Sequence, residues 1–158
     1  MAIRFAKLDP HHDAIPYDLL LLADPSKSLI DDYIGRGICY LAYDEDELVG
    51  EFVLIHTHPK TYEIVNIAVE EKHQGKGIGR QLLHKAIAVA VELQADSVEI
   101  GTGNSSVRQL ALYQRCGFRI TGIDHDFFVR HYDEEIFEDG IQCRDMIRLR
   151  QELHTDRR

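Results

Sequence analysis

Apolar and polar residues alternate along the first half of the chain in runs of strand length, with two short helical patterns between the first run and the second. Ser26 is a suitable N-cap for the second helical pattern, and Gly35 is a suitable residue to end it. The polar turn at residues 44–47 joins two runs as a hairpin, which favours an antiparallel arrangement for this half. The pattern predicts strands at residues 2–7, 38–43, 48–57 and 61–69, and helices at residues 18–23 and 26–34.

From Ile78 to Leu93 the apolar residues recur at the spacing of one helix face. The remaining pattern predicts a strand at 97–101, a helix through Tyr113 that begins near residues 104–106, and strands at 118–123 and 145–149. Residues 124–144 connect the last two strands and are longer than a hairpin needs. The order of elements predicts a mixed α/β fold in a single domain spanning residues 1–158.

A loop with three alternating glycines, Gly75, Gly77 and Gly79, separates the strand at 61–69 from the long helix. Glycine has no Cβ, so the backbone beside it can approach a ligand closely. The N-terminus of a helix offers unpaired N–H donors and a positive partial charge, and it commonly binds phosphate. Lys76 and Arg80 add positive charge next to these donors. The loop therefore predicts a site for a phosphorylated cofactor.

Two familiar phosphate-binding loops do not fit this spacing. A P-loop needs four residues between its first glycine and a Gly-Lys-Ser/Thr string, which the chain lacks. A dinucleotide fingerprint needs a third glycine where Arg80 stands, although Glu99 lies about where that fold places its ribose acid. A nucleotide- or NAD-binding enzyme therefore stays open as an alternative.

The loop does match the pattern Gln/Arg-x-x-Gly-x-Gly/Ala, through Gln74, Gly77 and Gly79. Together with the strand before it, the helix after it and Leu112-Tyr113 followed by Gly117-Phe118, residues 3–120 resemble the GNAT superfamily of N-acetyltransferases, in particular a bacterial subgroup. The resemblance implies an acyl-CoA acyltransferase fold, a mixed α+β sheet whose central strands at 61–69 and 97–101 splay apart. It also implies that acetyl-CoA is the cosubstrate. The residues expected at its pyrophosphate are Gln74, Gly75, Lys76, Gly77, Gly79 and Arg80.

The family inserts the pantetheine arm between the two splayed strands, where it pairs with main-chain groups. By resemblance these groups belong to Ile67 and Val69, whose side chains also suit a core. The family commonly has an asparagine seven residues before its helix tyrosine, but position 106 is serine here and the asparagine is Asn104. Either Asn104 or Ser106 is expected to contact pantetheine, and both also suit the start of a helix.

The resemblance implies direct transfer of the acetyl group to an amine within a ternary complex. A primary amine with a pKa of about 10.4 is protonated at neutral pH, so a base or a desolvating pocket must remove its proton. Glu63 falls at the family's base position, although a carboxylate at the start of a sheet-edge strand is also structural in many proteins. Tyr113 matches the tyrosine that protonates the leaving thiolate, with core packing as the alternative. The main-chain N–H of Ile67 is expected to stabilise the oxyanion.

The amino-acid composition indicates the charge of the molecule that accepts the acetyl group. With 18 basic and 27 acidic residues the net charge is −9, which argues against nucleic acid and favours a cationic amine, either a small molecule or a protein amine. No apolar run is long enough to span a membrane and no signal peptide is evident, so a cytoplasmic protein is expected. Dimers are common among the proteins that it resembles, so a homodimer is possible. An acyl-CoA sensor without turnover is a further alternative.

Neither a disulfide framework nor a metal site is expected from the sequence. The three cysteines, Cys39, Cys116 and Cys143, are odd in number and show no C-x-x-C spacing. Cys116 stands near the expected chemistry, but no histidine lies close to it in sequence, so packing is the better interpretation. The histidines show no metal-ligand spacing either.

Overall fold

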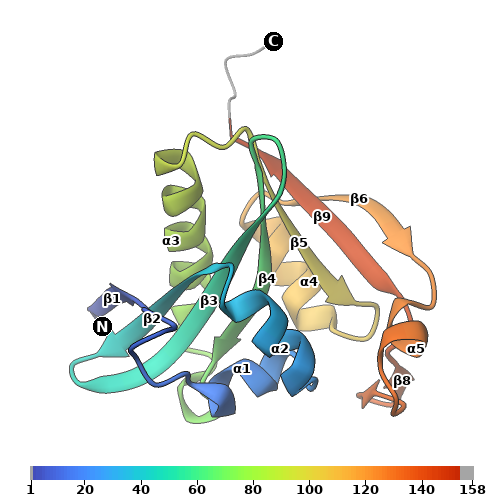
Figure 1. The fold of residues 1–158 in the computed structure, drawn as a ribbon. Coiled ribbons are helices and arrows are strands. Elements are labelled where there is room, and N and C mark those ends of the chain that lie inside the picture. The colour runs from blue at the N-terminus through green and yellow to red at the C-terminus, as the bar shows by residue number, and fades with distance from the viewer. Residues whose placement is uncertain (1, 154–158) are drawn as a thin grey trace.

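The computed structural model describes residues 2–153 and contains one large sheet with helices on both faces (Figure 1). The seven strands of the sheet lie in the order β1-β2-β3-β4-β5-β9-β6. They are β1 (Ile3–Lys7), β2 (Ile38–Asp44), β3 (Glu47–His58), β4 (Thr61–Val69), β5 (Ser97–Gly103), β6 (Arg119–Asp124) and β9 (Met146–Glu152). All neighbouring strands are antiparallel except β4 and β5, which are parallel.

Two layers of helices cover the sheet, and each layer encloses its own core. The helices are α1 (Tyr17–Ala23), α2 (Lys27–Ile34), α3 (Ile78–Glu92), α4 (Val107–Arg115), α5 (Phe127–His131) and the single-turn 3₁₀ helix η1 (Glu71–His73). On one face, α1 and α2 bury Leu20, Ile30 and Tyr33 against Val53 and Ile55 of β3. The opposite face packs against α3 and α4. The sheet therefore has an α1–α2 face and an α3–α4 face.

Most of the predicted elements are present within a few residues of their expected bounds. Ser26 caps α2 as expected, because its Oγ accepts a hydrogen bond from the N–H of Leu29 at 3.3 Å. Gly117 has φ of +99° just after α4, where the N–H of Phe118 bonds to the carbonyl oxygen of Tyr113 at 3.0 Å. No helix among residues 2–153 is long and apolar enough to cross a membrane.

Residues 124–144 were expected to be a connection, but they contain α5 and a small hairpin of β7 (Phe137–Glu138) and β8 (Ile141–Gln142). This segment is held by distant parts of the chain. The side chain of Asn104 donates to the carbonyl oxygen of Gln142 and accepts from the N–H groups of Arg144 and Asp145. Because these contacts span about 40 residues, the local sequence pattern did not reveal them.

Candidate active site

The central feature of the site is a gap between two strands that begin as neighbours. β4 pairs with β5 only from Thr61 to Ile64, opposite Ser97 to Ile100, although both strands continue beyond these residues. A bulge at Val65 interrupts the register between β4 and β3, after which β4 stays paired with β3 as far as Val69. From residue 65 onward, the edge of β4 that faces β5 has no strand partner among residues 2–153. Unpaired main-chain groups inside a sheet are costly to bury, so this edge is suited to an extended ligand.

Ile67 and Val69 both lie on this unpaired stretch, and both are half-buried against the core of the α3–α4 face. The side-chain amide of Gln74 donates to the carbonyl oxygen of Val69 at 3.1 Å. A ligand that donates to this oxygen would either share it with the Gln74 amide or displace that amide. The structure thus brings three of the expected cofactor residues to one end of the gap.

The glycine loop leads directly from this end of the gap into α3. Gly75 and Gly77 have φ values of +82° and +84°, which other residues rarely adopt. Gly77 is the N-cap residue of α3, and no side chain caps the helix, so its first N–H groups are free to bind an anion. A Cβ at Gly79 would lie 3.4 Å from the side chain of Leu112 of α4, so α4 packs next to the start of α3.

Lys76 is the basic residue of the loop whose position is fixed by other side chains. Its Nζ lies 3.2 Å from Nδ1 of His73, and Nε2 of His73 lies 2.9 Å from the carboxylate of Glu47. A lysine ammonium only donates, so Nδ1 is the acceptor and Nε2 carries the proton that Glu47 accepts. Arg80, in the first turn of α3, is exposed. Lys76 therefore has an ordered support that the sequence did not reveal.

Glu63 lies at the closed end of the gap, on the α1–α2 face. Its neighbours in the sheet are Ile55 of β3 and Glu99 of β5. Burial raises the pKa of the Glu63 carboxyl, the nearby Arg148 guanidinium opposes this rise, and Glu99 adds to it. A carboxyl with a raised pKa at the end of an open strand edge has the properties of a general base.

Tyr113 lies on the other side of the sheet, in the core of the α3–α4 face. Only 5% of its surface is exposed, and its ring packs edge-on against Phe118 with 6.4 Å between the ring centroids. Burial raises the pKa of its hydroxyl, so the phenol stays protonated and is a proton donor at neutral pH. Glu63 and Tyr113 thus approach the sheet from opposite faces.

Asn104 and Ser106 lie between the end of β5 and the start of α4. Asn104 uses its amide to hold residues 142–145, as described above. Ser106 is the N-cap residue of α4, but its side chain makes no capping hydrogen bond. The hydroxyls of Ser105 and Ser106 both donate to Glu138, at 2.8 and 2.7 Å. Ser106 retains lone pairs that can accept a further hydrogen bond, whereas the Asn104 amide is already shared among three main-chain groups.

A buried polar network on the α1–α2 face was not anticipated from the sequence. Asn66 of β4 donates to the carbonyl oxygen of Leu20 and to the hydroxyl of Tyr33, at 3.0 and 2.9 Å. Tyr33 donates to Asp24, and Tyr132 donates to the other oxygen of the same carboxylate at 2.9 Å. The network ties β4 and the two helices to the segment after α5. Its members come from four separate parts of the chain, so their spacing carries no local signal.

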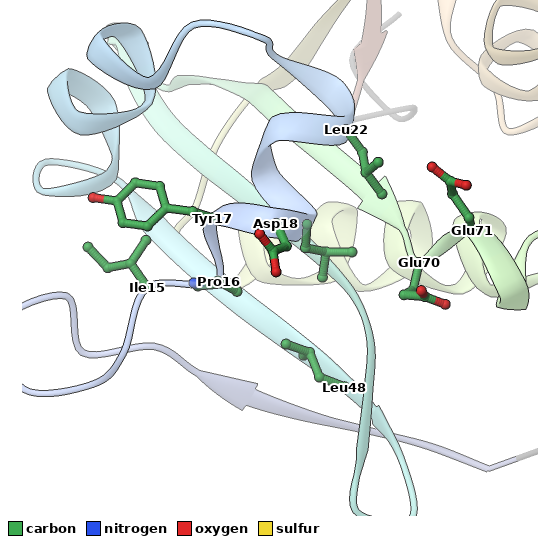
Figure 2. Close-up of a pocket in the computed structure, with 9 residues that line it drawn as sticks. Ile15, Pro16, Tyr17, Asp18, Leu22, Leu48, Glu70 and Glu71 are labelled. Carbon is green, nitrogen blue, oxygen red and sulfur yellow. The ribbon is translucent and has the colours of Figure 1, made fainter.

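A second opening, a cavity of about 530 Å³, lies beside α1 (Figure 2). Asp18, Glu70 and Glu71 line it together with apolar side chains that include Leu22 and Leu48. Glu70 accepts a hydrogen bond from the N–H of Lys72 at 3.1 Å and so caps η1. This contact favours a structural role for Glu70.

The cysteines and histidines of the described chain form no further site. All three cysteines are free, and Cys116 is the C-cap residue of α4. Within residues 2–153, no three His, Cys, Asp or Glu side chains are grouped so that they could hold a metal ion.

Comparisons with known proteins agree with this geometry. The family model described as the acetyltransferase (GNAT) family matches residues 9–118. The N-acetyltransferase YvbK of Bacillus subtilis is 66% identical over 133 residues, which cover 84% of this chain and 86% of that protein. A crystal structure of a Bacillus subtilis acetyltransferase in complex with CoA is 58% identical, with a TM-score of 0.92, and covers 97% of this chain and 100% of its own. A crystal structure of a GNAT family acetyltransferase from Elizabethkingia anophelis with acetyl-CoA bound is 51% identical, with a TM-score of 0.93. The match covers 96% of this chain and 98% of that one. The chain therefore belongs to the GNAT family of acetyltransferases.

Proposed function

We propose that this protein is an N-acetyltransferase that moves the acetyl group of acetyl-CoA to a primary amine by direct attack in a ternary complex. The observation that carries the proposal is the unpaired edge of β4, which runs from the bulge at Val65 to the glycine loop. An extended pantetheine arm along this edge would pair with Ile67 and Val69 and would deliver its pyrophosphate to the N-terminus of α3. The solved relatives that hold CoA or acetyl-CoA support this choice of cosubstrate.

The remaining contacts of the cofactor follow from the same placement. The pyrophosphate would accept hydrogen bonds from the main chain of Gly75, Gly77 and Gly79 and face the charges of Lys76 and Arg80. Gln74 would secure the end of β4. Ser106 is the better candidate for a direct contact to pantetheine, since Asn104 already holds the segment at 142–145.

The proposed reaction uses both faces of the sheet. The amine approaches on the α1–α2 face, where Glu63, directly or through one water, accepts a proton from the ammonium. The neutral amine then attacks the thioester carbonyl, and the N–H of Ile67 stabilises the oxyanion. As the C–S bond breaks, Tyr113 gives its proton to the thiolate from the α3–α4 face. The nitrogen loses its second proton as the amide forms, and this proton restores the Tyr113 phenol, while Glu63 releases the first proton to solvent. The products are the acetylated amine and CoA.

Charge favours a cationic acceptor but does not choose among small-molecule and protein amines. The net charge is −9, and Glu63 and Glu99 are both near the closed end of the gap on the α1–α2 face. An ammonium group is attracted to such a surface before it loses its proton.

The test is release of free CoA thiol from acetyl-CoA across a panel of primary amines and peptides, with the acetylated product identified by mass. For an active acceptor, initial rates at several concentrations of both substrates should give intersecting double-reciprocal lines, as a ternary complex requires. Parallel lines would indicate an acetylated enzyme and would contradict direct attack. Binding of acetyl-CoA without thiol release for any acceptor would favour the sensor alternative.

A further inference from the structure

The histidine that precedes the glycine loop is buried, and the proposed reaction does not use it. His73 ends the 3₁₀ helix η1, and only 7% of its surface is exposed. Burial of an imidazole is unfavourable unless its ring nitrogens have hydrogen-bond partners. Nε2 lies 2.9 Å from Oε2 of Glu47, the first residue of β3, and Nδ1 lies 3.2 Å from Nζ of Lys76. His73 therefore connects the start of a strand to the lysine of the glycine loop.

The position of Lys76 is electrostatically unfavourable without an anion beside it. Lys76 directly precedes Gly77, the N-cap residue of α3, and the N-terminus of a helix carries a positive partial charge. Arg80 in the first turn of α3 adds a further positive charge. Lys76 is also exposed, so its side chain has room to turn away from these charges into solvent. The contact with Nδ1 of His73 holds the ammonium near the loop instead.

Glu47 fixes the imidazole in the form that makes this contact. A neutral imidazole has one donor and one acceptor nitrogen, and the Glu47 carboxylate at Nε2 selects the tautomer whose Nδ1 accepts from Lys76. The ammonium has two further N–H donors, which can face a phosphate. We propose that His73 is a positioning residue for the cosubstrate and that, with Glu47, it holds the Lys76 ammonium at the site of the acetyl-CoA pyrophosphate. The inference rests on the proposed function, because it requires acetyl-CoA at the N-terminus of α3.

The same contacts order the loop before any ligand binds. Lys72 and His73 both contact Oε2 of Glu47, at 2.9 Å each, which joins η1 to the start of β3. Lys76, three residues after His73, then ties the glycine loop back to η1. A loop that is already ordered loses less conformational entropy when it binds a ligand. His73 thus favours cofactor binding both through the charge of Lys76 and through the order of the loop.

His73→Leu tests the proposal, because leucine keeps an apolar body in the buried position and makes neither polar contact. Calorimetric titration should show that the dissociation constant for CoA rises about tenfold or more, as expected when a charge-assisted contact is lost. The KM for acetyl-CoA should rise while kcat is retained, because the loop lies at the opposite end of the gap from Glu63. The kcat/KM for S-acetylpantetheine, which has no phosphate, should be unchanged.

Lys76→Met shows whether the effect passes through the lysine, because methionine keeps an apolar chain and removes the ammonium. This variant should lose a similar factor in CoA affinity. The double variant His73→Leu/Lys76→Met should lose little more than either single variant, because the two residues act in one chain of contacts. Losses that multiply would show independent effects and would overturn the role of His73 as a support for Lys76. If His73→Leu does not fold, His73→Gln replaces it, since its amide can still donate to Glu47 but has no acceptor in the place of Nδ1.

His58→Leu is the matched control, because it makes the same exchange at an exposed histidine at the other end of β3 and should leave CoA affinity unchanged. Unchanged CoA affinity in a folded His73→Leu protein would overturn the proposal, and so would equal losses for acetyl-CoA and S-acetylpantetheine. Either result would leave the proposed function in place if Gly77→Val still abolishes CoA binding. Absence of CoA binding by the unmodified protein would contradict the proposed function and, with it, this inference.

Discussion

Glu51 and Glu63 lie on the same face of neighbouring strands, and burial raises the pKa of both carboxyl groups. Glu63 lies at the closed end of the gap and near Arg148, whereas Glu51 is fully buried and neither of its oxygens has a hydrogen-bond partner. A carboxyl beside a substrate site can use a raised pKa for proton transfer, but a sealed one only reduces stability. We therefore expect substitution of Glu63 to change the rate of catalysis, and substitution of Glu51 to change the stability of the fold.

Replacing Glu63 with Gln should lower kcat/KM by roughly 10²–10⁴ near neutral pH, because the amide keeps the shape but cannot accept the proton. The deficit should shrink as the pH approaches the pKa of the amine, where free neutral amine needs no base. In the unmodified enzyme, kcat/KM should rise with a group whose pKa lies above the usual glutamate value of about 4.3. The measurement is the pH profile of kcat/KM for both proteins.

Glu99→Gln is the control for this experiment, since it removes a charge next to Glu63 on the same face. Because Glu99 raises the pKa of Glu63, this variant should stay active and shift the rising limb of the profile to lower pH. A Glu63→Gln deficit that is modest and independent of pH, together with a lower melting temperature, would indicate that Glu63 is structural.

Tyr113→Phe should slow turnover by about 10- to 1,000-fold without changing the affinity for acetyl-CoA, because in the proposed mechanism the hydroxyl only protonates the departing thiolate. Phenylalanine keeps the ring contact with Phe118, so the fold should be retained. Single-turnover kinetics and calorimetric titration with acetyl-CoA would separate the two effects. An unchanged rate, measured where chemistry limits turnover, would remove Tyr113 from the mechanism.

Replacing Glu51 with Met should stabilise the protein most at high pH. The pKa of Glu51 is raised in the folded state, so its contribution to stability is greatest below the unfolded pKa and falls as the pH rises toward the folded pKa.

Glu47, at the start of the same strand, should show the opposite dependence of stability on pH. His73 and then Lys72 lower the pKa of Glu47 to about 2, so Glu47→Gln should destabilise the protein at neutral pH and lose this effect in acid.

Urea unfolding from about pH 2 to pH 9 measures both effects, and the two variants serve as controls for each other. Loss of stability in Glu51→Met at every pH would show that the carboxyl has a bound partner, such as an internal water, that the apolar side chain cannot replace.

At the scale of elements, the sequence predicts best where a local period is strong. The strand at 61–69 was predicted with the bounds that the structure shows, and the long helix was predicted with its observed first residue, Ile78, because an apolar run and a helical repeat meet at a glycine loop. The helix α5 and the hairpin of β7 and β8 were not predicted. The N–H of Phe128 bonds to Arg144, and that of Asp126 bonds to the side chain of Asp145, so these elements depend on distant residues.

The same distinction applies to the candidate site. The sequence indicated Glu63 because it is a charged residue in an apolar strand. It indicated Tyr113 because Leu112 precedes it and Gly117-Phe118 follow it. Glu51 also interrupts an apolar strand, but its complete burial depends on helices that the sequence pattern alone does not place over it. Likewise, nothing in the spacing of Asp24 and Tyr132 indicates their hydrogen bond across 108 residues.

Gly77→Val should abolish CoA binding while the fold is largely retained. A valine at φ of +84° is strained by about 1–3 kcal/mol, so the loop would rearrange and withdraw the N–H groups at the start of α3. No atom lies within 4 Å of the added Cβ, so the effect comes from the backbone and not from a collision. Gly35→Val is the control, since Gly35 also has open space but an ordinary helical φ. Calorimetry that shows unchanged CoA affinity in a folded Gly77→Val protein would contradict the pyrophosphate assignment.

At the scale of the whole molecule, the gap divides the sheet into two parts that meet only where β4 and β5 pair. The pair spans four residues on each strand, and the network from Asn66 to Tyr132 crosses to the segment after α5 on the α1–α2 face. A ligand that pairs with β4 inside the gap adds contacts between the two parts. Binding of such a ligand should therefore raise the free energy of unfolding of the entire molecule.

CoA at 100 times its dissociation constant should stabilise the folded protein by about 2.7 kcal/mol, because it binds the folded state and not the unfolded chain. For a domain of this size each kcal/mol raises the melting temperature by about 2–4 °C, so a shift of about 5–11 °C is expected in differential scanning calorimetry. NAD at the same concentration should give no shift, and Gly77→Val should lose the shift with CoA. Stabilisation by NAD without stabilisation by CoA would instead favour a dinucleotide-binding enzyme, since both ligands carry a pyrophosphate and only the pantetheine arm needs the unpaired edge of β4.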